Sequence, residues 1–129
     1  MQNDIQIRVR YNECDRMGVL HHSQYLAYFE IGRIEMLRAI GGDYGQIEDD
    51  GFFIVVVDAH VNFKRPARFD DLLDLRTHLV RTTLVKLVYQ YELKRGETLL
   101  ATGKTTLAMV DSDGKPCRLP EWLQLHEDN

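Results

Sequence analysis

Hydrophobic and polar residues alternate at the start of the chain. Every second position from residue 5 to residue 11 is apolar, and the positions between are polar: Ile5, Ile7, Val9 and Tyr11 against Gln6, Arg8 and Arg10. A period of two is typical of a strand that buries one face. The pattern therefore predicts a half-buried strand over residues 5–11.

From residue 25 onward the period becomes helical. Apolar residues and glycine recur at spacings of three and four: Tyr25, Tyr28, Phe29, Gly32, Met36, Ala39 and Ile40. This spacing predicts an amphipathic helix, which the glycine pair at residues 41–42 should end. Counted from His22 to Ile40, the helix would be about 28 Å long at about 1.5 Å per residue, which is enough to cross a small sheet.

The remainder of the chain shows strand patterns separated by short turns. A polar loop is expected over 43–51, and the apolar run over 52–66 is interpreted as a central strand. Three more strands and a short C-terminal helix are predicted after it: 73–79, 85–93, 98–110 and 119–126. Because no βαβ alternation occurs, the expected fold class is α+β, with an antiparallel sheet of about five strands packed around one long helix.

Length and charge limit the classes of function. A chain of 129 residues predicts a single domain over 1–129. A net charge of −4 argues against nucleic-acid binding, which calls for a basic face. The first residues lack the apolar core of a signal peptide, and no segment approaches the ~20 apolar residues of a membrane span, so a cytoplasmic protein is expected. Cys14 and Cys117 lack a C-x-x-C spacing and are expected to be reduced thiols.

The link between the first strand and the helix carries the candidate chemistry. A helix N-terminus presents unpaired N–H groups and a partial positive charge, so it can polarise a carbonyl oxygen near His22. Asp15 lies seven residues earlier, and Gly18 between them can take the backbone angles that fold the loop back. An acid beside such a site indicates hydrolysis of an activated acyl group, by direct attack or through a water molecule.

A longer motif surrounds these residues: Tyr11-x-Glu13-x-Asp15-x-x-Gly18-Val19-x-x-His22-x-x-Tyr25, continuing into Glu30-x-x-Arg33. It resembles the signature of the 4-hydroxybenzoyl-CoA thioesterase family of hotdog-fold proteins, most of all its Tol-Pal-associated acyl-CoA thioesterase branch. The segments FKRPARFDDLLDL and VDSDGKPCRLP extend the resemblance over nearly the whole chain. The resemblance implies a hotdog fold, with the sheet wrapped around the central helix. It also implies homodimers that assemble into homotetramers, with active sites at the dimer interface.

The resemblance further implies an acyl-CoA thioesterase that needs no cofactor or metal, with coenzyme A entering only as part of the substrate. By position, Asp15 matches the catalytic aspartate, as nucleophile or general base, in a loop that turns at Gly18. The N–H of His22 matches the donor to the thioester carbonyl, and its ring matches a histidine that orients substrate or water. Tyr11 matches a tyrosine near the same pocket.

The expected substrate-binding residues are Tyr25 and three cations that are candidates for the coenzyme A phosphates: Lys64, Arg65 and Arg68. The sequence also departs from the commoner pattern of the family. Glu13-Cys14 stands where Asp-Thr is frequent, and Leu20-His21 stands where Val-Tyr is frequent. These changes leave the acyl-group preference open.

Several alternatives remain open on the sequence alone. Asp15 can be a turn residue that bonds backbone N–H groups, and Cys14 can be a nucleophile or an inert buried thiol. Glu30 can be an acid on the helix, although an ion pair with Arg33 is the simpler account. Hydrolysis of acyl groups on acyl carrier protein and non-catalytic binding of acyl thioesters are alternative functions. Adjacent histidines without a third ligand at a recognisable spacing do not indicate a metal site.

Overall fold

The computed structural model describes residues 1–124 and contains one sheet and one long helix. The strands are β1 (Gln2–Arg8), β2 (Phe52–Phe63), β3 (Leu72–Thr82), β4 (Lys86–Arg95) and β5 (Thr98–Asp111). The helices are α1 (Gln24–Ala39) and α2 (Tyr44–Asp49), with single 3₁₀ turns η1 (Tyr11–Glu13) and η2 (Glu121–Leu123). Within residues 1–124 no helix combines the length and apolarity needed to cross a membrane.

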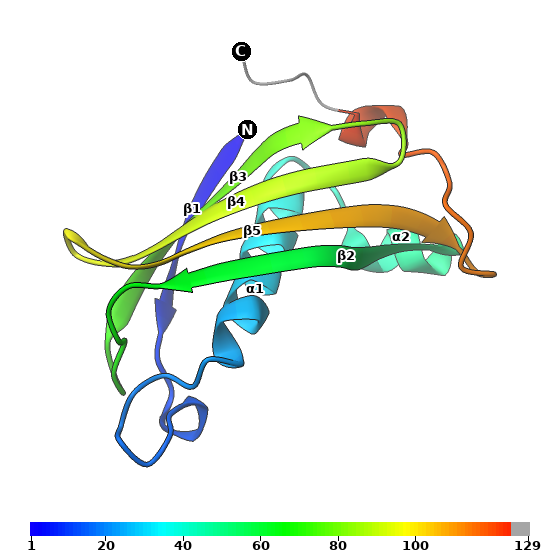
Figure 1. Ribbon diagram of the computed structural model, residues 1–129. Helices are drawn as coiled ribbons and strands as arrows, with labels where there is room; N and C mark the ends of the chain where they lie inside the picture. Colours follow the sequence, from blue (N-terminus) through cyan, green and yellow to red (C-terminus); the bar gives the residue numbers. More distant parts are fainter. Residues whose placement is uncertain (125–129) are drawn as a thin grey trace.

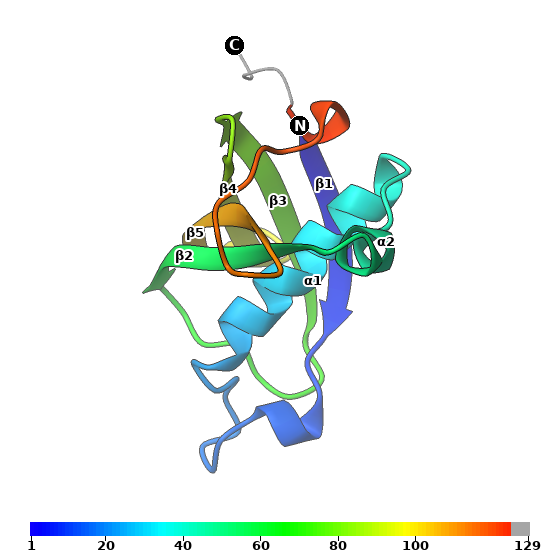
Figure 2. The same ribbon diagram turned by 90° about the vertical axis from the view of Figure 1, so that its right-hand side faces the viewer.

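All five strands form one antiparallel sheet in the order β1-β3-β4-β5-β2. The sheet curves around α1, which lies across its concave face (Figures 1 and 2). This is the α+β arrangement expected from the sequence. Alternation along β3 and β4 places apolar side chains against the helix and polar side chains on the outer face, as the buried and exposed positions along both strands show.

The helix packs closely on the sheet through aromatic and glycine residues. The ring of Phe29 stacks on Tyr91, with 4.2 Å between centroids and 5° between planes. A Cβ at Gly103 of β5 would collide with the Phe29 ring. One turn further along α1, a Cβ at Gly32 would collide with the Thr77 hydroxyl of β3. Glycine at both positions therefore allows the helix to sit deep in the curved sheet.

Two predicted boundaries near the N-terminus are wrong. The first strand ends at Arg8, and Tyr11 lies in η1 with 80% of its surface exposed rather than beside Ile5 and Ile7. Val9 lies beyond the last residue of β1, although its N–H still donates to the Asp71 carbonyl. The alternation of apolar and polar residues therefore extends past the end of the strand. The helix begins at Gln24 instead of His22 and is about 24 Å long at about 1.5 Å per residue.

The polar segment 43–51 was expected to be a loop but contains α2. Asp43 is its N-cap, because its Oδ1 accepts the Gln46 N–H at 3.2 Å. Ile47 is the one buried residue of the six. Six residues make fewer than two turns, too few for a helical period to be visible in the sequence.

The apolar run after residue 51 is an edge strand, not the expected central one. β2 pairs only with β5, and most of its residues are exposed, including Val55, Val56 and Val57. The apolar run indicated a strand buried within this chain, whereas β2 is itself the edge of the sheet. At the C-terminus the expected helix is reduced to η2, and residues 125–126 of that prediction lie outside the described residues.

We predict that Gly32→Ala lowers the free energy of unfolding by about 1–3 kcal/mol, because the added methyl overpacks the contact with Thr77 and Leu75. On helix propensity alone, alanine would raise stability by up to about 1 kcal/mol. The matched control is Gly45→Ala in α2, where the nearest atom is Asp43 Oδ1 at 3.4 Å and stability should be unchanged or slightly higher. Urea denaturation of both variants checks the sign, and a stabilised Gly32→Ala protein would contradict the close packing of α1.

Candidate active site

The segment between η1 and α1 folds into a hairpin-like loop. Three contacts join its two arms: His21 N–H to the Glu13 carbonyl (2.9 Å), a β-bridge between Cys14 and Leu20, and Asp15 N–H to the Val19 carbonyl (2.9 Å). Figure 1 shows this loop beyond the end of the sheet, beside the first turn of α1. The loop therefore brings Asp15 and the entrance of the helix into one hydrogen-bonded unit.

Asp15 is an exposed carboxylate at the tip of this loop. Its Oδ1 accepts the N–H of Met17 at 2.9 Å and the N–H of Val19 at 3.4 Å. Gly18 has φ +76°, a left-handed conformation that closes the turn at little cost for glycine. Oδ2 has no hydrogen-bond partner among residues 1–124. Asp15 is thus a turn residue through one oxygen and has the other oxygen available for chemistry.

The backbone N–H of His22 is a free donor at the entrance to α1. Its neighbours Ser23, Gln24 and Tyr25 all donate their N–H groups, to His21 Nδ1 (3.2 Å) and to the His21 and His22 carbonyls (3.0 and 3.4 Å). No partner for the His22 N–H exists in the part of the chain that the structure describes. A free N–H beside the positive end of a helix can donate to a carbonyl oxygen or an anion.

Most of the predicted site residues line one of two hollows. Tyr11, Asp15 and Gly18 line an open hollow of about 600 Å³ together with Phe69, whose ring meets Tyr11 edge to face at 5.4 Å. His22, Tyr25, Lys64 and Arg65 line a second hollow of about 270 Å³ with Leu20, Phe63 and Pro66. Arg68 lines neither of these hollows, but it forms a β-bridge with Val19 between them.

Tyr25 is a wall of the second hollow more than a polar contact. Only 3% of its surface is exposed, and its ring meets Phe63 edge to face at 4.9 Å. Burial raises the pKa of its hydroxyl above the ordinary value, although a backbone contact with Ala67 lowers it. The hydroxyl therefore stays protonated at neutral pH.

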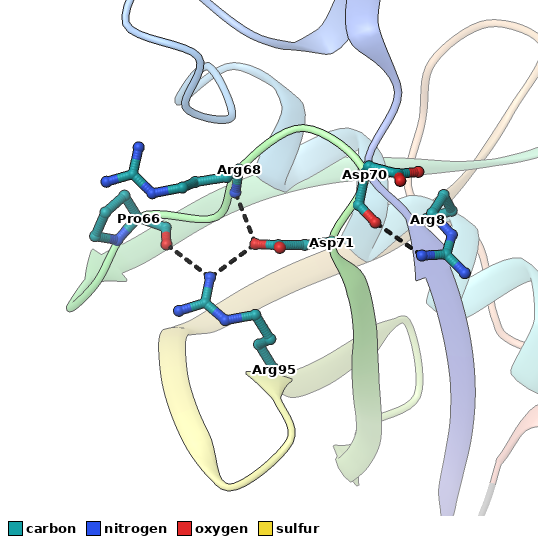
Figure 3. A network of polar contacts seen from close by, with 6 residues as sticks. All are labelled: Arg8, Pro66, Arg68, Asp70, Asp71 and Arg95. Atoms are coloured by element: carbon teal, nitrogen blue, oxygen red, sulfur yellow. Dashed lines mark hydrogen bonds and ion pairs between the residues drawn. The ribbon is translucent and has the colours of Figure 1, made fainter.

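The segment that carries the three candidate phosphate-binding cations is held by a polar network (Figure 3). Arg95 donates to Asp71 Oδ2 at 2.7 Å and to the Pro66 carbonyl at 3.3 Å. The same Oδ2 accepts the backbone N–H of Arg68 at 2.9 Å. The guanidinium of Arg68 points away from Asp71 (Figure 3), and Lys64 and Arg65 are exposed. The backbone is thus fixed while the cationic groups face outward.

The alternative chemical groups are less suited to catalysis. Burial raises the pKa of the Cys14 thiol, and the neighbouring Asp15 and Glu13 raise it further, so the reactive thiolate is disfavoured. The expected Glu30–Arg33 ion pair does not form in the described chain, because Arg33 donates to the Tyr91 hydroxyl at 3.1 Å. No group of three possible metal ligands occurs within residues 1–124.

Two features of this region are not among the predicted site residues. Phe63 and Phe69 line the two hollows; both lie in the segment FKRPARFDDLLDL, but only its cations are predicted to bind substrate. Tyr28 of α1 donates its hydroxyl to Glu13 Oε1 at 2.7 Å, which ties the helix to the loop. The helical period indicates Tyr28 only as a core residue. The one signal of this contact in the sequence is that Glu13 stands where aspartate is frequent in the family.

Comparison with known proteins defines the class to which this fold and site belong. Residues 9–125 match the profile of the thioesterase-like superfamily. The chain belongs to this superfamily, whose fold is the hotdog fold expected from the motif.

Individual relatives are similar along most of the chain. "Acyl-CoA thioester hydrolase YbgC" of Escherichia coli O157:H7 is 32% identical over 117 residues, covering 89% of this chain and 87% of the relative. The crystal structure of "DHNA-CoA Thioesterase" from Staphylococcus aureus superposes with a TM-score of 0.90 at 30% identity, covering 95% of this chain and 86% of the other. "Acyl-acyl carrier protein thioesterase ATL2, chloroplastic" of Arabidopsis thaliana is 25% identical, covering 95% of this chain and 66% of the relative.

We predict that Asp71→Asn lowers the free energy of unfolding by about 1 kcal/mol at pH 7, because Arg95 then donates to a neutral amide instead of a carboxylate. Burial raises the pKa of Asp71, but the Arg68 N–H and the Arg95 guanidinium lower it by more. A lowered folded-state pKa adds stability above the unfolded-state pKa of about 3.9, and this stability is lost as the pH falls through the folded-state pKa.

Urea denaturation at pH 7 and at about pH 3 tests this assignment, with the difference between wild type and Asp71→Asn expected to shrink at low pH. The matched control is Asp74→Asn on β3, an exposed carboxylate whose bond comes from the neutral Gln6 amide. It should change stability by less than about 0.5 kcal/mol. An equal loss for Asp71→Asn at both pH values would contradict the charged network.

Proposed function

We propose that this protein is an acyl-CoA thioesterase, which hydrolyses an acyl-CoA to a free carboxylic acid and coenzyme A. One observation carries the proposal: the free N–H of His22 at the entrance to α1 belongs to the same hydrogen-bonded loop as the exposed carboxylate of Asp15. Thioester hydrolysis needs two groups: a hydrogen-bond donor to the carbonyl oxygen, and a carboxylate that attacks the carbonyl carbon or activates a water molecule to do so. The similarity to an acyl-CoA thioester hydrolase supports the same reaction.

The His22 N–H would donate to the thioester carbonyl oxygen and stabilise the negative charge that develops there. In one route Asp15 Oδ2 bonds to the carbonyl carbon, the C–S bond breaks, and coenzyme A leaves as a thiolate. Water then hydrolyses the resulting anhydride and regenerates the carboxylate. In the other route Asp15 takes a proton from water, whose oxygen attacks the carbonyl carbon; the C–S bond then breaks, and the leaving thiolate of coenzyme A takes up the proton held by Asp15. The His22 ring would orient the substrate or the water in either route, and Tyr11 and Gly18 would line the hollow around the attacking group.

The cations of residues 64–68 are the proposed contacts for the coenzyme A phosphates. Lys64 and Arg65 line the same hollow as His22, and Arg68 bridges to Val19 between the two hollows. Their charged groups face outward from a backbone that Asp71 and Arg95 hold. Tyr25 would form the apolar floor under the acyl end of the substrate.

A second copy of the chain is proposed to complete the site. β2 is a twelve-residue edge strand with exposed apolar side chains, and such an edge pairs readily with another strand. Antiparallel pairing of two β2 edges is compatible with a two-fold axis. Phe63 ends β2, is 55% exposed and lines the hollow of His22, so the edge and the site are continuous. We propose a homodimer through β2, with dimers paired into a homotetramer.

A second candidate function is hydrolysis of acyl groups on acyl carrier protein. The outward-facing cations that suit phosphates equally suit an acidic protein surface, and one relative is named for that activity. A non-catalytic binder of acyl thioesters is the third possibility, and it would not depend on Asp15. The Tol-Pal-associated branch, a cytoplasmic location and independence of any cofactor or metal belong to the same proposal, and the acyl group is left open.

We predict that Asp15→Asn lowers kcat/KM at least ~100-fold, about 2.7 kcal/mol of transition-state stabilisation, on the acyl-CoA that the wild type hydrolyses fastest. Asparagine keeps the oxygen that accepts from Met17 and Val19, so the loop should remain folded. Thiol release from acetyl-, long-chain and benzoyl-CoA measures the effect and identifies the acyl class. Asp113→Asn, in the exposed turn after β5, is the matched control and should retain full activity.

The same assay separates the three candidate functions. Faster hydrolysis of acyl carrier protein thioesters than of any acyl-CoA would favour the second function. A folded wild type that binds acyl-CoA without releasing thiol would overturn both enzymatic functions.

We predict that Val56→Lys on the β2 edge converts the dimer to a monomer, because it buries a charge at an apolar strand pair. Sedimentation velocity should give at least twice the chain mass for the wild type and one chain mass for the variant. Gln90→Lys is the matched control, since it adds the same charge to the exposed face of the interior strand β4. An unchanged oligomer in Val56→Lys would exclude β2 as the interface.

A further inference from the structure

Glu13 connects three segments around the proposed site. Its Oε1 accepts the Tyr28 hydroxyl at 2.7 Å and the backbone N–H of Arg10 at 2.7 Å. Its carbonyl accepts the N–H of His21 at 2.9 Å. One residue thus bonds to the link that follows β1, to the second turn of α1 and to the residue before His22.

The bond to Tyr28 is the only one of the three that reaches into the helix itself. Tyr28 is 1% exposed and lies in the second turn of α1, so its ring is fixed by the core. Burial raises the pKa of its hydroxyl, and Glu13 raises it further, so the hydroxyl remains a donor. A charged acceptor makes this bond stronger than a neutral one.

Glu13 also lies two residues before Asp15 on the same arm of the loop. The arm is attached to the opposite arm by the bonds that flank the Cys14–Leu20 bridge. The loop is also joined to the residue 64–71 segment, through Leu20 N–H to the Ala67 carbonyl at 2.8 Å, and to the first residue of α1, through Gln24 N–H to the His21 carbonyl at 3.0 Å. The Glu13–Tyr28 bond adds a side-chain link from the Asp15 arm to the second turn of α1.

We propose that Glu13 is a positioning residue, which through Tyr28 holds the Asp15 carboxylate in register with the His22 N–H. This inference rests on the proposed function and adds the group that sets the geometry between its two reacting partners. Small displacements of reacting groups lower the rate by up to about 100-fold. Loss of the Glu13–Tyr28 bond should therefore lower kcat by a larger factor than its effect on stability would suggest. Neither Glu13 nor Tyr28 lines either hollow, so KM should change little.

The test compares kcat and KM of Tyr28→Phe, Glu13→Ala and Glu13→Gln on the preferred acyl-CoA. Tyr28→Phe and Glu13→Ala should each lower kcat at least tenfold with KM changed less than threefold. Combining Tyr28→Phe with Glu13→Ala should cost no more than Glu13→Ala alone, because both remove the same bond. Glu13→Gln keeps an oxygen acceptor and should restore kcat to within about threefold of the wild type.

Tyr44→Phe is the matched control for a lost tyrosine hydroxyl. Its hydroxyl donates to the Ile54 carbonyl at 3.3 Å, far along the chain from the loop, so it should lose stability similar to Tyr28→Phe but keep kcat. Full kcat in both Tyr28→Phe and Glu13→Ala would overturn the positioning role. Equal losses of kcat in Tyr44→Phe and Tyr28→Phe would show that kcat falls with any loss of stability, and would also overturn the positioning role of Glu13.

Asp15→Asn in the same assay separates this inference from the proposed function. An inactive Asp15→Asn beside a fully active Tyr28→Phe would leave the thioesterase function standing and remove the role of Glu13. A wild type that hydrolyses no thioester would remove both. If Tyr28→Phe does not fold, the pair Glu13→Ala and Glu13→Gln decides, because Glu13 is only partly buried and its replacement leaves the core intact.

Discussion

The depth at which α1 sits in the curved sheet controls the position of everything at its N-terminal end. Two glycines set this depth, because Gly103 lies under the ring of Phe29 and Gly32 lies against Thr77. A side chain at either position would force the helix away from the strands. A regular helix of sixteen residues moves largely as one body, so a displacement there would also move Tyr28 and its bond to Glu13 in the loop.

The exposed edge of β2 and the hollow of His22 meet at Phe63. Stable single-chain sheets usually protect their edges with charge, proline or short strands, whereas β2 presents twelve residues with an apolar run. Both hollows are open to solvent, and the phenylalanines that line them, Phe63 and Phe69, are 55% and 50% exposed. An acyl group needs an apolar enclosure, so a surface that covers β2 beyond Phe63 would enclose the substrate as well.

Periodicity predicted those parts of the fold in which one face is buried within this chain. It located α1 and the strands β3 to β5, because burial on one face leaves a period in the sequence. It misplaced β2 because an apolar run is typical of a buried central strand, whereas β2 is an edge strand whose residues are mostly exposed. It missed α2, whose single buried residue, Ile47, creates no period. The motif singled out Asp15, Gly18 and His22 by residue type, but the bond from Tyr28 to Glu13 depends on tertiary packing that no spacing reveals.

The hydrogen bonds of the loop distinguish groups that hold the structure from groups that are available to react. Asp15 was open to two interpretations, as a turn residue or as a catalytic nucleophile or general base, and the geometry makes them compatible. Oδ1 accepts from Met17 and Val19 and so fixes the plane of the carboxylate, while Oδ2 has no partner among residues 1–124. At the helix entrance, Gln24 and Tyr25 donate their N–H groups, whereas the His22 N–H has no acceptor in the same described residues. In the proposed reaction these two groups would need little reorganisation, because hydrogen bonds fix their neighbours, and this is the condition under which fixed dipoles lower a barrier most.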